Sequence, residues 1–302
     1  MKTPVGKRLV IFGCGYLGIA VARGAVAAGL QVDALTHNSA RATELAAAGV
    51  HAVVADLAGC EWHDRVAPGA DLVLNCVGSG GRGIAGYRRS YVDGMRSILA
   101  WAIRGPVGTI VYTSSTSVYP QTGGALIDES APTDGVGGNG RILVEAEALL
   151  RQSVKACDRW FIFRLAGIYG PGRHQLLDQI RAGAAEIRGS GEHRLNLVHR
   201  DDIVAAIGAA FSAPVGVRDR IFNLVDDAPA TRMDVVQWLA VQSGRSAPPF
   251  AGGAAGARRG IAEPLDRRIG NARLKAELGW RPRYPSFREG YRQILDEISS
   301  IK

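Results

Sequence analysis

The sequence predicts an α/β fold built on a doubly wound parallel sheet. Residues 9–18 have the pattern of a buried strand, a glycine turn and the first turn of a helix. Strand-like and helix-like segments alternate after them, which is typical of parallel strands joined by right-handed crossovers. The 302 residues are 47% hydrophobic and 21% charged, which is enough apolar material for a large core. We therefore expect a Rossmann-like core with a smaller C-terminal substrate-binding cap.

The glycines after the first strand predict a dinucleotide site. Gly13 lets the chain reverse direction, Gly15 lets backbone approach a phosphate, and Gly18 lets the next helix pack closely on the sheet. Free N–H groups and the positive end of the helix dipole converge there, and both favour a bound anion. A purely structural turn is the alternative, but here a strand precedes the glycines and a helix follows them. The predicted contacts are Gly13, Gly15, Tyr16, Leu17 and Gly18.

The other elements follow in chain order. Residues 1–165 are expected to form the dinucleotide-binding core, to which about 199–225 return, and residues 166–302 the smaller substrate-binding region. Thr231 with Asp234 predicts a capped helix start, and Gly279 predicts a helix end. The expected strands are Gln31–Thr36, Val50–Ala55, Asp71–Val77, Val107–Thr113, Trp160–Leu165 and Arg220–Leu224. The expected helices are Tyr16–Ala28, Ala40–Ala48, Tyr87–Arg104, Gly140–Cys157, Asp201–Phe211, Thr231–Ser243, Asn271–Leu278 and Ser286–Ile298.

The residues after the second strand favour NADP over NAD. In NAD-binding proteins an acidic side chain at this place holds the ribose hydroxyls. Here the place is taken by Thr36, His37 and Asn38, while Asp33 lies too early in the strand. His37 and Arg41 are placed to meet a 2′-phosphate. We therefore expect NADP, with Thr36, His37, Asn38 and Arg41 at the adenosine end.

Three later segments are expected at the same crevice, because each follows a parallel strand. Asp56 and Leu57 close the third strand, where the carboxylate would accept from the adenine amino group or, equally, cap a short helix. Val77 leads into the glycine cluster of residues 78–83. The hydroxyl-rich segment of residues 113–120 would hold a carbonyl or alcohol, with Ser114 on the cofactor side.

With these segments in place, the chain resembles the extended short-chain dehydrogenases/reductases, the NAD-dependent epimerase/dehydratase family. The glycine turn is closer to that of atypical members. The supporting motifs occur in the family's order across most of the chain. They are Thr113-Ser114-Ser115-Thr116-Ser117-Val118-Tyr119-Pro120, Asp128-Glu129-x-x-Pro132, Arg164-Leu165-Ala166-Gly167-Ile168-Tyr169-Gly170-Pro171-Gly172, His199-Arg200-Asp201-Asp202 and Phe222-Asn223-Leu224.

The chain departs from this family at the residues that move protons. The resemblance implies a tyrosine and, four residues later, a lysine on one face of a helix. One register places Asn139 and Leu143 at these positions, and a shifted register places Gly137 and Arg141 there. An asparagine side chain can donate or accept a hydrogen bond but cannot deliver a proton. Arg141 would then replace the positive charge of the lysine near the ribose.

Ser115 stands at the position of the family's catalytic serine, so a substrate oxygen could still be bound and polarised. Tyr119, His174 and His199 are the candidate proton donors. Each has a structural alternative: packing for Tyr119, a structural role for His199 and a solvent-facing position for His174. Arg267 and Arg268 precede the last helices and would face a substrate phosphate or carboxylate, or simply solvent.

Three functions remain open at this point, because one scaffold carries many activities. The first is an atypical NADP(H)-dependent oxidoreductase of a small carbonyl, imine or alcohol. The second is a non-catalytic NADP-binding sensor or partner protein. The third is a nucleotide-sugar epimerase or dehydratase, which begins with an alcohol oxidation that calls for a base. We rank them in this order.

Composition excludes several other classes. The net charge is +8, but the sequence has no nucleic-acid motif, so no nucleic-acid partner is expected. It has no signal or membrane-spanning segment, and we expect a cytoplasmic protein with no membrane partner. The four cysteines stand singly, which predicts free thiols and no metal site.

Two flexible segments and a homodimer complete the expectations. The glycine-rich residues 123–140 are expected to form a mobile loop, either a lid or an ordinary surface loop. The Ala, Gly and Pro content of residues 246–260 predicts a flexible connection. By resemblance, two copies would pair through the helices near Tyr87–Arg104 and Gly140–Cys157.

Overall fold

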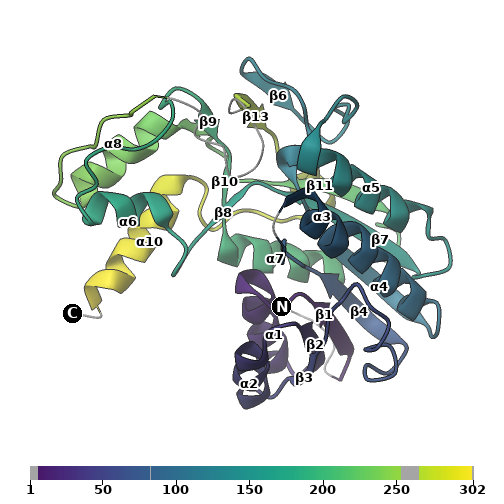
Figure 1. Ribbon diagram of the computed structural model, residues 1–302. Coiled ribbons are helices and arrows are strands. Elements are labelled where there is room, and N and C mark those ends of the chain that lie inside the picture. Colours follow the sequence, from purple (N-terminus) through teal and green to yellow (C-terminus); the bar gives the residue numbers. More distant parts are fainter. Residues whose placement is uncertain (1–5, 82, 253–264, 301–302) are drawn as a thin grey trace. The chain divides into compact units, whose positions relative to one another are not determined.

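The structure is a computed structural model that describes residues 6–81, 83–252 and 265–300. Its largest sheet has seven strands in the order β11-β7-β5-β4-β1-β2-β3 (Figure 1). Every strand predicted from the sequence is present, with ends that shift by one or two residues. The strands are β1 Arg8–Phe12, β2 Gln31–Thr36, β3 His51–Val54, β4 Ala70–Asn75, β5 Val107–Ser115, β7 Arg159–Leu165 and β11 Arg220–Leu224.

The register of the central strands aligns their carboxyl ends at one edge. β1 pairs in parallel with both β2 and β4, so that Phe12 lies opposite Leu35 on one side and Asn75 on the other. β3 and β5 extend the parallel arrangement outward. The residues that follow Phe12, Thr36 and Asn75 therefore leave the sheet at the same edge, which is where parallel sheets bind ligands.

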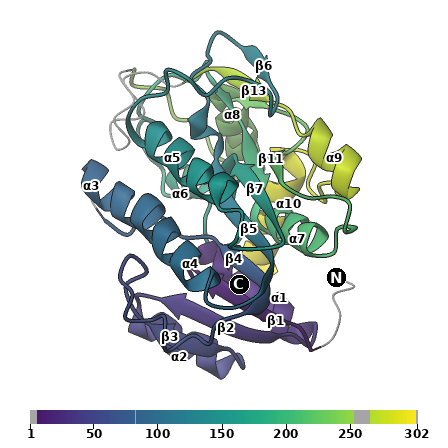
Figure 2. The same ribbon diagram turned by 90° about the vertical axis from the view of Figure 1, so that its right-hand side faces the viewer.

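Helices cover both faces of the sheet, as the doubly wound prediction requires. α1 (Tyr16–Ala27) and α2 (Ser39–Ala47) lie on one face, and α3, α4 and α5 lie together on the other (Figure 2). The helix predicted at Tyr87–Arg104 begins earlier, as α3 (Gly83–Arg88), and ends as α4 (Gly94–Ala102). A π-helical turn, η1 (Arg89–Asp93), joins them, and the Gly94 N–H donates to Arg89 O five residues earlier. α5 (Gly138–Gln152) starts earlier and ends earlier than expected.

The core between the sheet and these helices is built on three large rings. Phe12 of β1 lies 4.9 Å from Trp62 and 5.5 Å from Trp101, measured between ring centroids. All three side chains are fully buried. The indole N–H of Trp62 donates to Leu57 O, and that of Trp101 donates to Val66 O. The turns of residues 57–66 are thereby anchored against α4, because each buried polar ring atom has a backbone partner.

A buried ion pair joins α5 to the sheet. Arg164 of β7 donates from Nε to Glu147 Oε1 over 3.1 Å and from Nη2 to Glu147 Oε2 over 2.7 Å. Ser114 of β5 donates to the same Glu147 Oε1 over 2.7 Å. Both charged side chains are almost completely buried. A bidentate guanidinium and a hydroxyl together satisfy this carboxylate away from water.

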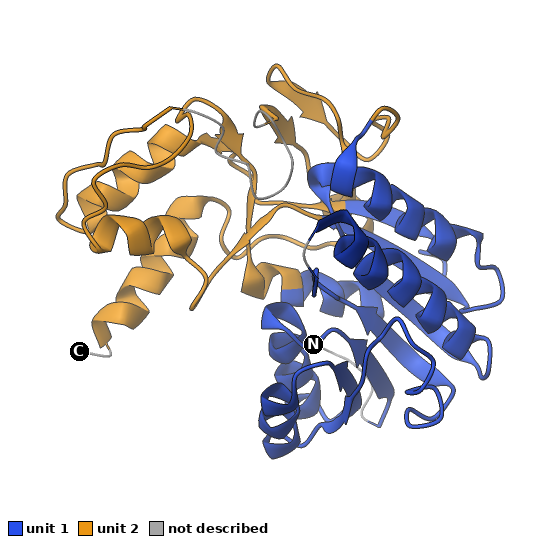
Figure 3. Ribbon diagram, in the orientation of Figure 1, with its two compact units in different colours: residues 1–118, 136–164, 204–222 blue, residues 119–135, 165–203, 223–302 orange. Residues whose placement is uncertain are grey.

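The described chain divides into two compact units (Figure 3). Unit 1 comprises residues 1–118, 136–164 and 204–222 and contains most of the large sheet. Unit 2 comprises residues 119–135, 165–203 and 223–302. Residues 119–135 belong to unit 2, although they lie within the N-terminal domain that the sequence predicts. The linking helix α7 (Arg200–Phe211) has residues in both units.

Unit 2 has its own core, made by three helices and small sheets. α6 (Gln175–Arg181), α8 (Arg232–Gln242) and α10 (Phe287–Ser300) bury residues such as Ile180, Leu239 and Ile294 against one another. α9 is Ala272–Leu278, and it ends at Gly279, which has a φ of +64°. Three strand pairs complete the unit: β8 (Gly167–Tyr169) with β10 (Leu197–His199), β9 (Arg194–Leu195) with β12 (Ala230–Thr231), and β6 (Ala125–Ile127) with β13 (Arg267–Ile269).

The structure corrects the prediction of a continuous loop over residues 123–140. β6 lies within this segment and pairs in parallel with β13. The sequence gives little sign of it, since the partner strand is about 140 residues away and three residues are too short for a periodic pattern. The capped start of α8 is confirmed: Thr231 and Asp234 each accept the backbone N–H of the other.

The predicted flexible connection at residues 246–260 lies partly outside the described residues. In its described part, Pro249 O accepts the N–H of Ile187, and Gly252 O accepts that of Gly189. This stretch is therefore tied to unit 2 through backbone hydrogen bonds. None of the helices in the described ranges is long and apolar enough to cross a bilayer.

We expect Glu147→Gln to lower the free energy of unfolding by about 3 kcal/mol, because it leaves a buried guanidinium without its counter-charge. Urea unfolding measures this. The matched control is Asp64→Asn. The Asp64 side chain is 85% exposed, and it pairs with Arg104 at the surface. The control should cost less than about 1 kcal/mol. Equal, small losses in the two variants would show that the buried pair does not stabilise unit 1.

Candidate functional site

The glycine turn after β1 is packed too closely for any other residue at two of its positions. Gly13 has a φ of +95°, and a Cβ there would lie 2.6 Å from both the N and the Cα of Val77. A Cβ on Gly18 would lie 2.4 Å from the carbonyl oxygen of Gly13. Both contacts are with backbone, which cannot give way. Gly13 and Gly18 therefore hold β1, β4 and α1 together at the carboxyl edge of the sheet.

Gly15 has a different environment, because the space beside it is open. An added Cβ would meet nothing within 4 Å in the described chain. Gly15 is the N-cap of α1, and no described side chain caps this helix end. The helix start at Tyr16 and Leu17 thus presents backbone to an open space. A cradle of this kind fits a pyrophosphate, which needs N–H donors and close backbone approach.

Two cysteines lie at the same turn, but neither has the character of a nucleophile. Burial raises the pKa of the Cys14 thiol to about 12. Burial also raises the pKa of Cys76, whose Sγ donates to Gly13 O over 3.1 Å. Because the thiolate is the reactive form, these protonated thiols serve as packing around the turn.

The end of β2 has the features that the sequence predicts for the adenosine end. Thr36 is buried and its Oγ1 accepts the Asn38 N–H, while Asn38 Oδ1 accepts the Arg41 N–H as the N-cap of α2. His37 is exposed beside them. Asp33 lies too early in the strand to bind the ribose hydroxyls. Its carboxylate is also engaged, because it is paired with both Arg8 and His51. The described strand end thus offers donors and no free carboxylate.

Arg41 is already engaged in this structure. Its Nη1 lies 2.6 Å from Glu44 Oε2, and the other oxygen of Glu44 lies 2.8 Å from Arg23. These side chains are at least one third exposed, so the pairing is weak and can exchange. A 2′-phosphate would compete with Glu44 for the guanidinium.

Asp56 and Leu57 both have protein partners in this structure, and their contact with adenine stays a prediction. The Asp56 carboxylate accepts the Ala58 N–H over 3.0 Å and the Arg89 Nε–H over 3.1 Å, and this Arg89 hydrogen bond lowers the pKa of Asp56. Residues 57–66 form turns, so the alternative of a capped short helix is wrong. Leu57 is buried under Gly94 of α4, so its side chain is part of the core.

The glycine cluster after β4 is brought next to His37. Gly81 and Gly86 touch, since a Cβ on either would lie within 2.7 Å of the other's Cα. The Gly80 N–H donates to Ser90 Oγ, and His37 Cε1 is 3.9 Å from where a Gly80 Cβ would be. Arg82 lies outside the described residues. The sequence does not predict the hydrogen bond between Gly80 and Ser90, because the residues around Gly80 give no sign of a partner ten residues later.

The two serines at the end of β5 have separate surroundings. Ser114 Oγ donates to the buried Glu147, so its side chain is committed to the core of unit 1. Ser115 is half-buried, and its Oγ accepts the Ser117 N–H over 3.2 Å. The alternation of a strand sends neighbouring side chains to opposite faces. Of the two hydroxyls, that of Ser115 is the one left for a ligand.

The start of α5 lies against the turn that follows Ser115. A Cβ on Gly140 would be 2.6 Å from Ser117 O, so only glycine permits this approach. Asn139 is half-buried beside it, whereas Leu143 is buried and Arg141 is exposed. Of the residues that the two registers compare with a tyrosine and a lysine, Arg141 is thus the exposed cation and Leu143 is part of the core.

The proposed role of Tyr119 as a proton donor is corrected by the structure. Tyr119 is fully buried, and its hydroxyl donates to Asn223 Oδ1 over 2.8 Å. Its carbonyl accepts from Arg267, which is itself buried, and Arg268 donates to Gly124 O. Tyr119 therefore has a packing role. Arg267 and Arg268 both donate to backbone carbonyls of unit 2.

The two candidate histidines also belong to unit 2. His199 is fully buried between Tyr169 and Tyr284, its Nδ1 accepts the Asp201 N–H, and burial lowers its pKa to about 4. It is a neutral core residue, as the structural alternative states. His174 stands at the N-cap of α6 with its Nδ1 2.8 Å from Asp178 Oδ1 and its side chain 13% exposed.

No metal centre is formed by the part of the chain that the structure describes, since it contains no cluster of three His, Cys, Asp or Glu side chains suited to an ion. Among the candidates that the sequence offers, Ser115 and Asn139 of unit 1 and His174 of unit 2 are only partly buried. The residues that fit a dinucleotide are all in unit 1.

A family model and a solved structure match most of this chain. The model of the "NAD dependent epimerase/dehydratase family" matches residues 9–224, from β1 to β11. A solved structure of a functionally unknown conserved protein from Silicibacter pomeroyi has a TM-score of 0.75 and 26% identity. That similarity covers 96% of this chain and 99% of the other.

Two curated relatives match about two thirds of this chain. Protein YeeZ of Escherichia coli (strain K12) is 31% identical over 195 residues, which are 65% of each chain. The 2-alkyl-3-oxoalkanoate reductase of Stenotrophomonas maltophilia (strain K279a) is 28% identical over 225 residues, 68% of this chain and 66% of the relative. The chain covers less than two thirds of the length of each relative.

We expect Gly15→Ala to weaken NADPH binding at least tenfold without changing stability, because the new methyl group enters open space where a phosphate would lie. The free energy of unfolding should stay within about 0.5 kcal/mol. Gly18→Ala should instead lower it by roughly 1–3 kcal/mol, because its methyl group meets Gly13 O. Fluorescence titration and urea unfolding measure the two effects. Unchanged NADPH affinity in Gly15→Ala would argue against a pyrophosphate at this turn.

Proposed function

The chain belongs to the NAD-dependent epimerase/dehydratase family, and we propose that it is an NADP(H)-dependent oxidoreductase that reduces a small carbonyl or imine compound. The observation that carries this proposal is the contrast within unit 1. The glycine turn that suits a dinucleotide is present, whereas neither register of the resemblance gives a tyrosine and a lysine at the start of α5, where Asn139 and Leu143 or Gly137 and Arg141 stand. The name of one curated relative, a reductase, supports the direction of the reaction.

Residues of unit 1 account for cofactor binding in this proposal. The N–H groups at the start of α1, with Gly15, would hold the pyrophosphate. His37 and Arg41 would bind a 2′-phosphate, because a cationic or N–H donor pairs well with phosphate and the exposed Glu44 holds Arg41 only weakly. When bound, the nicotinamide supplies a hydride.

Ser115 would orient the substrate oxygen. Its Oγ accepts the Ser117 N–H, and a hydroxyl that accepts one hydrogen bond still has its own proton to donate. Asn139 could hold the substrate but cannot give up a proton. The proton that completes the reduction would therefore come from water. An alcohol oxidation would instead require a base, which is the reason to favour reduction over sugar epimerisation.

A second candidate is a protein that binds NADP without turnover. The same positions support it, because an amide and an alkyl group at residues 139 and 143 would also suit a site that has lost catalysis. The two candidates differ in one measurable property. A reductase consumes NADPH with some carbonyl or imine in a panel, whereas a sensor binds NADPH and consumes none.

Pairing of two copies stays a prediction. The helices expected at the interface, α3 to α4 and α5, already lie together in unit 1. Glu145 of α5 pairs with Arg88 over 2.6 Å and with Arg96 over 3.4 Å. A second copy would add to this helical layer.

We expect the wild type to bind NADPH at least tenfold more tightly than NADH, and Asn38→Asp to remove most of that preference. Aspartate caps a helix as well as asparagine does, so α2 should be retained, while the new charge repels a 2′-phosphate. Fluorescence titration with both cofactors gives the ratio. Asn38→Ser keeps the cap without the charge and should keep the preference. A wild type that prefers NADH would overturn the NADP assignment.

We expect Ser115→Ala to lower kcat/KM for reduction by about 10²-fold, because the donor to the substrate oxygen is lost. Its stability should be that of the wild type. Ser114→Ala is the matched variant: it removes the hydroxyl on Glu147 and should cost roughly 1–3 kcal/mol of stability, measured by urea unfolding. Full turnover by Ser115→Ala would disprove its role. NADPH oxidation across a carbonyl panel is the assay, and its complete absence in the wild type would favour the sensor.

A further inference from the structure

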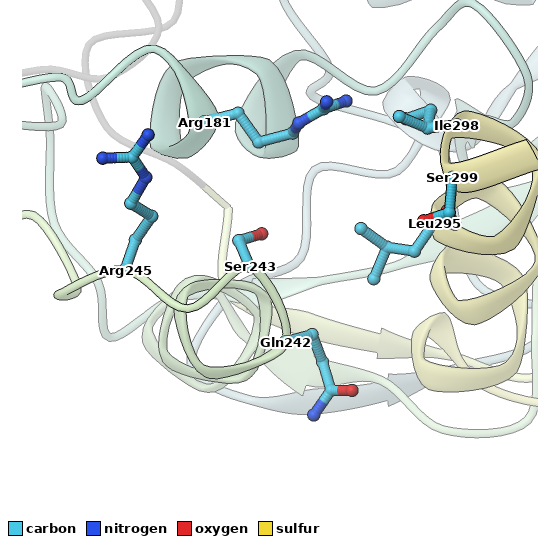
Figure 4. Close-up of a pocket in the computed structure, with 7 residues that line it drawn as sticks. All are labelled: Arg181, Gln242, Ser243, Arg245, Leu295, Ile298 and Ser299. Atoms are coloured by element: carbon cyan, nitrogen blue, oxygen red, sulfur yellow. The ribbon is translucent and has the colours of Figure 1, made fainter. Parts of the chain in front are cut away.

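A pocket of about 310 Å³ lies within unit 2, at the ends of three helices. Arg181 belongs to the last turn of α6, Ser243 is the C-cap of α8, and Leu295 and Ile298 come from the last turns of α10. Figure 4 shows Ser243 between Arg245 on one side and Leu295 on the other, with Arg181 reaching across toward Ile298. The proposed function assigns no role to any of these residues.

The pocket has two guanidinium groups that nothing in the described chain neutralises. Within residues 6–81, 83–252 and 265–300, neither the Arg181 nor the Arg245 guanidinium has a hydrogen-bond or ion-pair partner. The described residues that line the pocket include no carboxylate. In Figure 4 the two guanidinium groups lie on different sides of the pocket, so they offer two separate places for negative charge.

A buried hydroxyl lies between these charges. Ser243 Oγ has almost no exposed surface and no hydrogen-bond partner among the described atoms. A buried polar atom without a partner carries a cost of about 1–3 kcal/mol. A ligand oxygen in the pocket would remove that cost, which is a reason for the pocket to be filled.

The walls of the pocket are held in place by the helix ends. Gly244 has a φ of +61°, its N–H donates to Val241 O, and the Arg245 N–H donates to Ala240 O. The end of α6 repeats the arrangement, with Gly183 at a φ of +71° and its N–H on Ile180 O. Paired hydrogen bonds of this kind fix the backbone on both sides, so Arg181 and Arg245 start from rigid positions.

Helix C-termini carry partial negative charge, which opposes an anion. The effect is about half a charge per helix and is confined to the last turn. Part of it is cancelled here by the backbone N–H groups that bond the last carbonyls of α6 and α8. The two positive charges of Arg181 and Arg245 exceed the partial negative charge that remains at the helix ends. A guanidinium can also contact a carboxylate directly.

We propose that this pocket binds a short dicarboxylate, with one carboxylate on each guanidinium. Ser243 would donate to one of the carboxylate oxygens. The methylene groups between the carboxylates would lie along Leu295 and Ile298, which give the pocket its apolar side. Two separated cations and one apolar wall match two charges joined by a short alkyl chain better than they match a single compact anion.

The test is calorimetric titration of the full chain with glutarate at low salt. We expect saturable binding that weakens at least tenfold in Arg181→Gln and in Arg245→Gln. Ser243→Ala, a small change at a helix cap, should weaken it severalfold. Arg151→Gln, an exposed arginine of α5, is the control and should bind glutarate as the wild type does. Equal melting temperatures show that each variant is folded.

Butyrate and inorganic phosphate distinguish the ligand classes. Butyrate has one carboxylate and should bind at least tenfold more weakly than glutarate, and phosphate should also bind more weakly. The proposal is overturned if glutarate shows no saturable heat, if the two arginine variants bind it like the wild type, or if phosphate binds as tightly. Because NADPH is absent from these titrations, none of these outcomes bears on the proposed reductase activity.

Discussion

The close approach of three backbone segments at the end of β1 is the constraint on which the cofactor site depends. Gly13 lies against the backbone of Val77, and Gly18 lies against the carbonyl of Gly13. No side chain fits between them, so α1 starts at a fixed place at the edge of the sheet. Gly15, which lies between these two glycines in the chain, is exposed and has open space beside it.

A second anchor holds α5 against the sheet of unit 1. Glu147, Arg164 and Ser114 tie α5 to β5 and β7 in the interior, and Gly140 lets the start of α5 touch the turn after Ser115. The position of Asn139 beside that turn is therefore set by buried contacts two helical turns away. The same geometry would place a tyrosine there if the sequence had one.

The glycine turn and the residues at the start of α5 together explain why we favour a reaction in which the protein supplies little acid–base catalysis. The hydroxyl of Ser115 can polarise a carbonyl, but the described part of unit 1 has no titratable donor assigned to the same place. His199 and Tyr119, which the sequence offered as substitutes, are committed to the core of unit 2. A polarised carbonyl that takes its proton from water needs neither of them.

The sequence alone was sufficient for the parallel sheet, the glycine turn and the absence of a carboxylate after β2, because these depend on local patterns of apolar and glycine residues. It was not sufficient for β6, for the Gly80 contact with Ser90, or for the surroundings of Tyr119 and His199. Each of these depends on partners far along the chain, such as Arg267 for Tyr119. Whether a polar side chain faces a ligand or a buried partner is decided by tertiary packing, since the same residue type serves both.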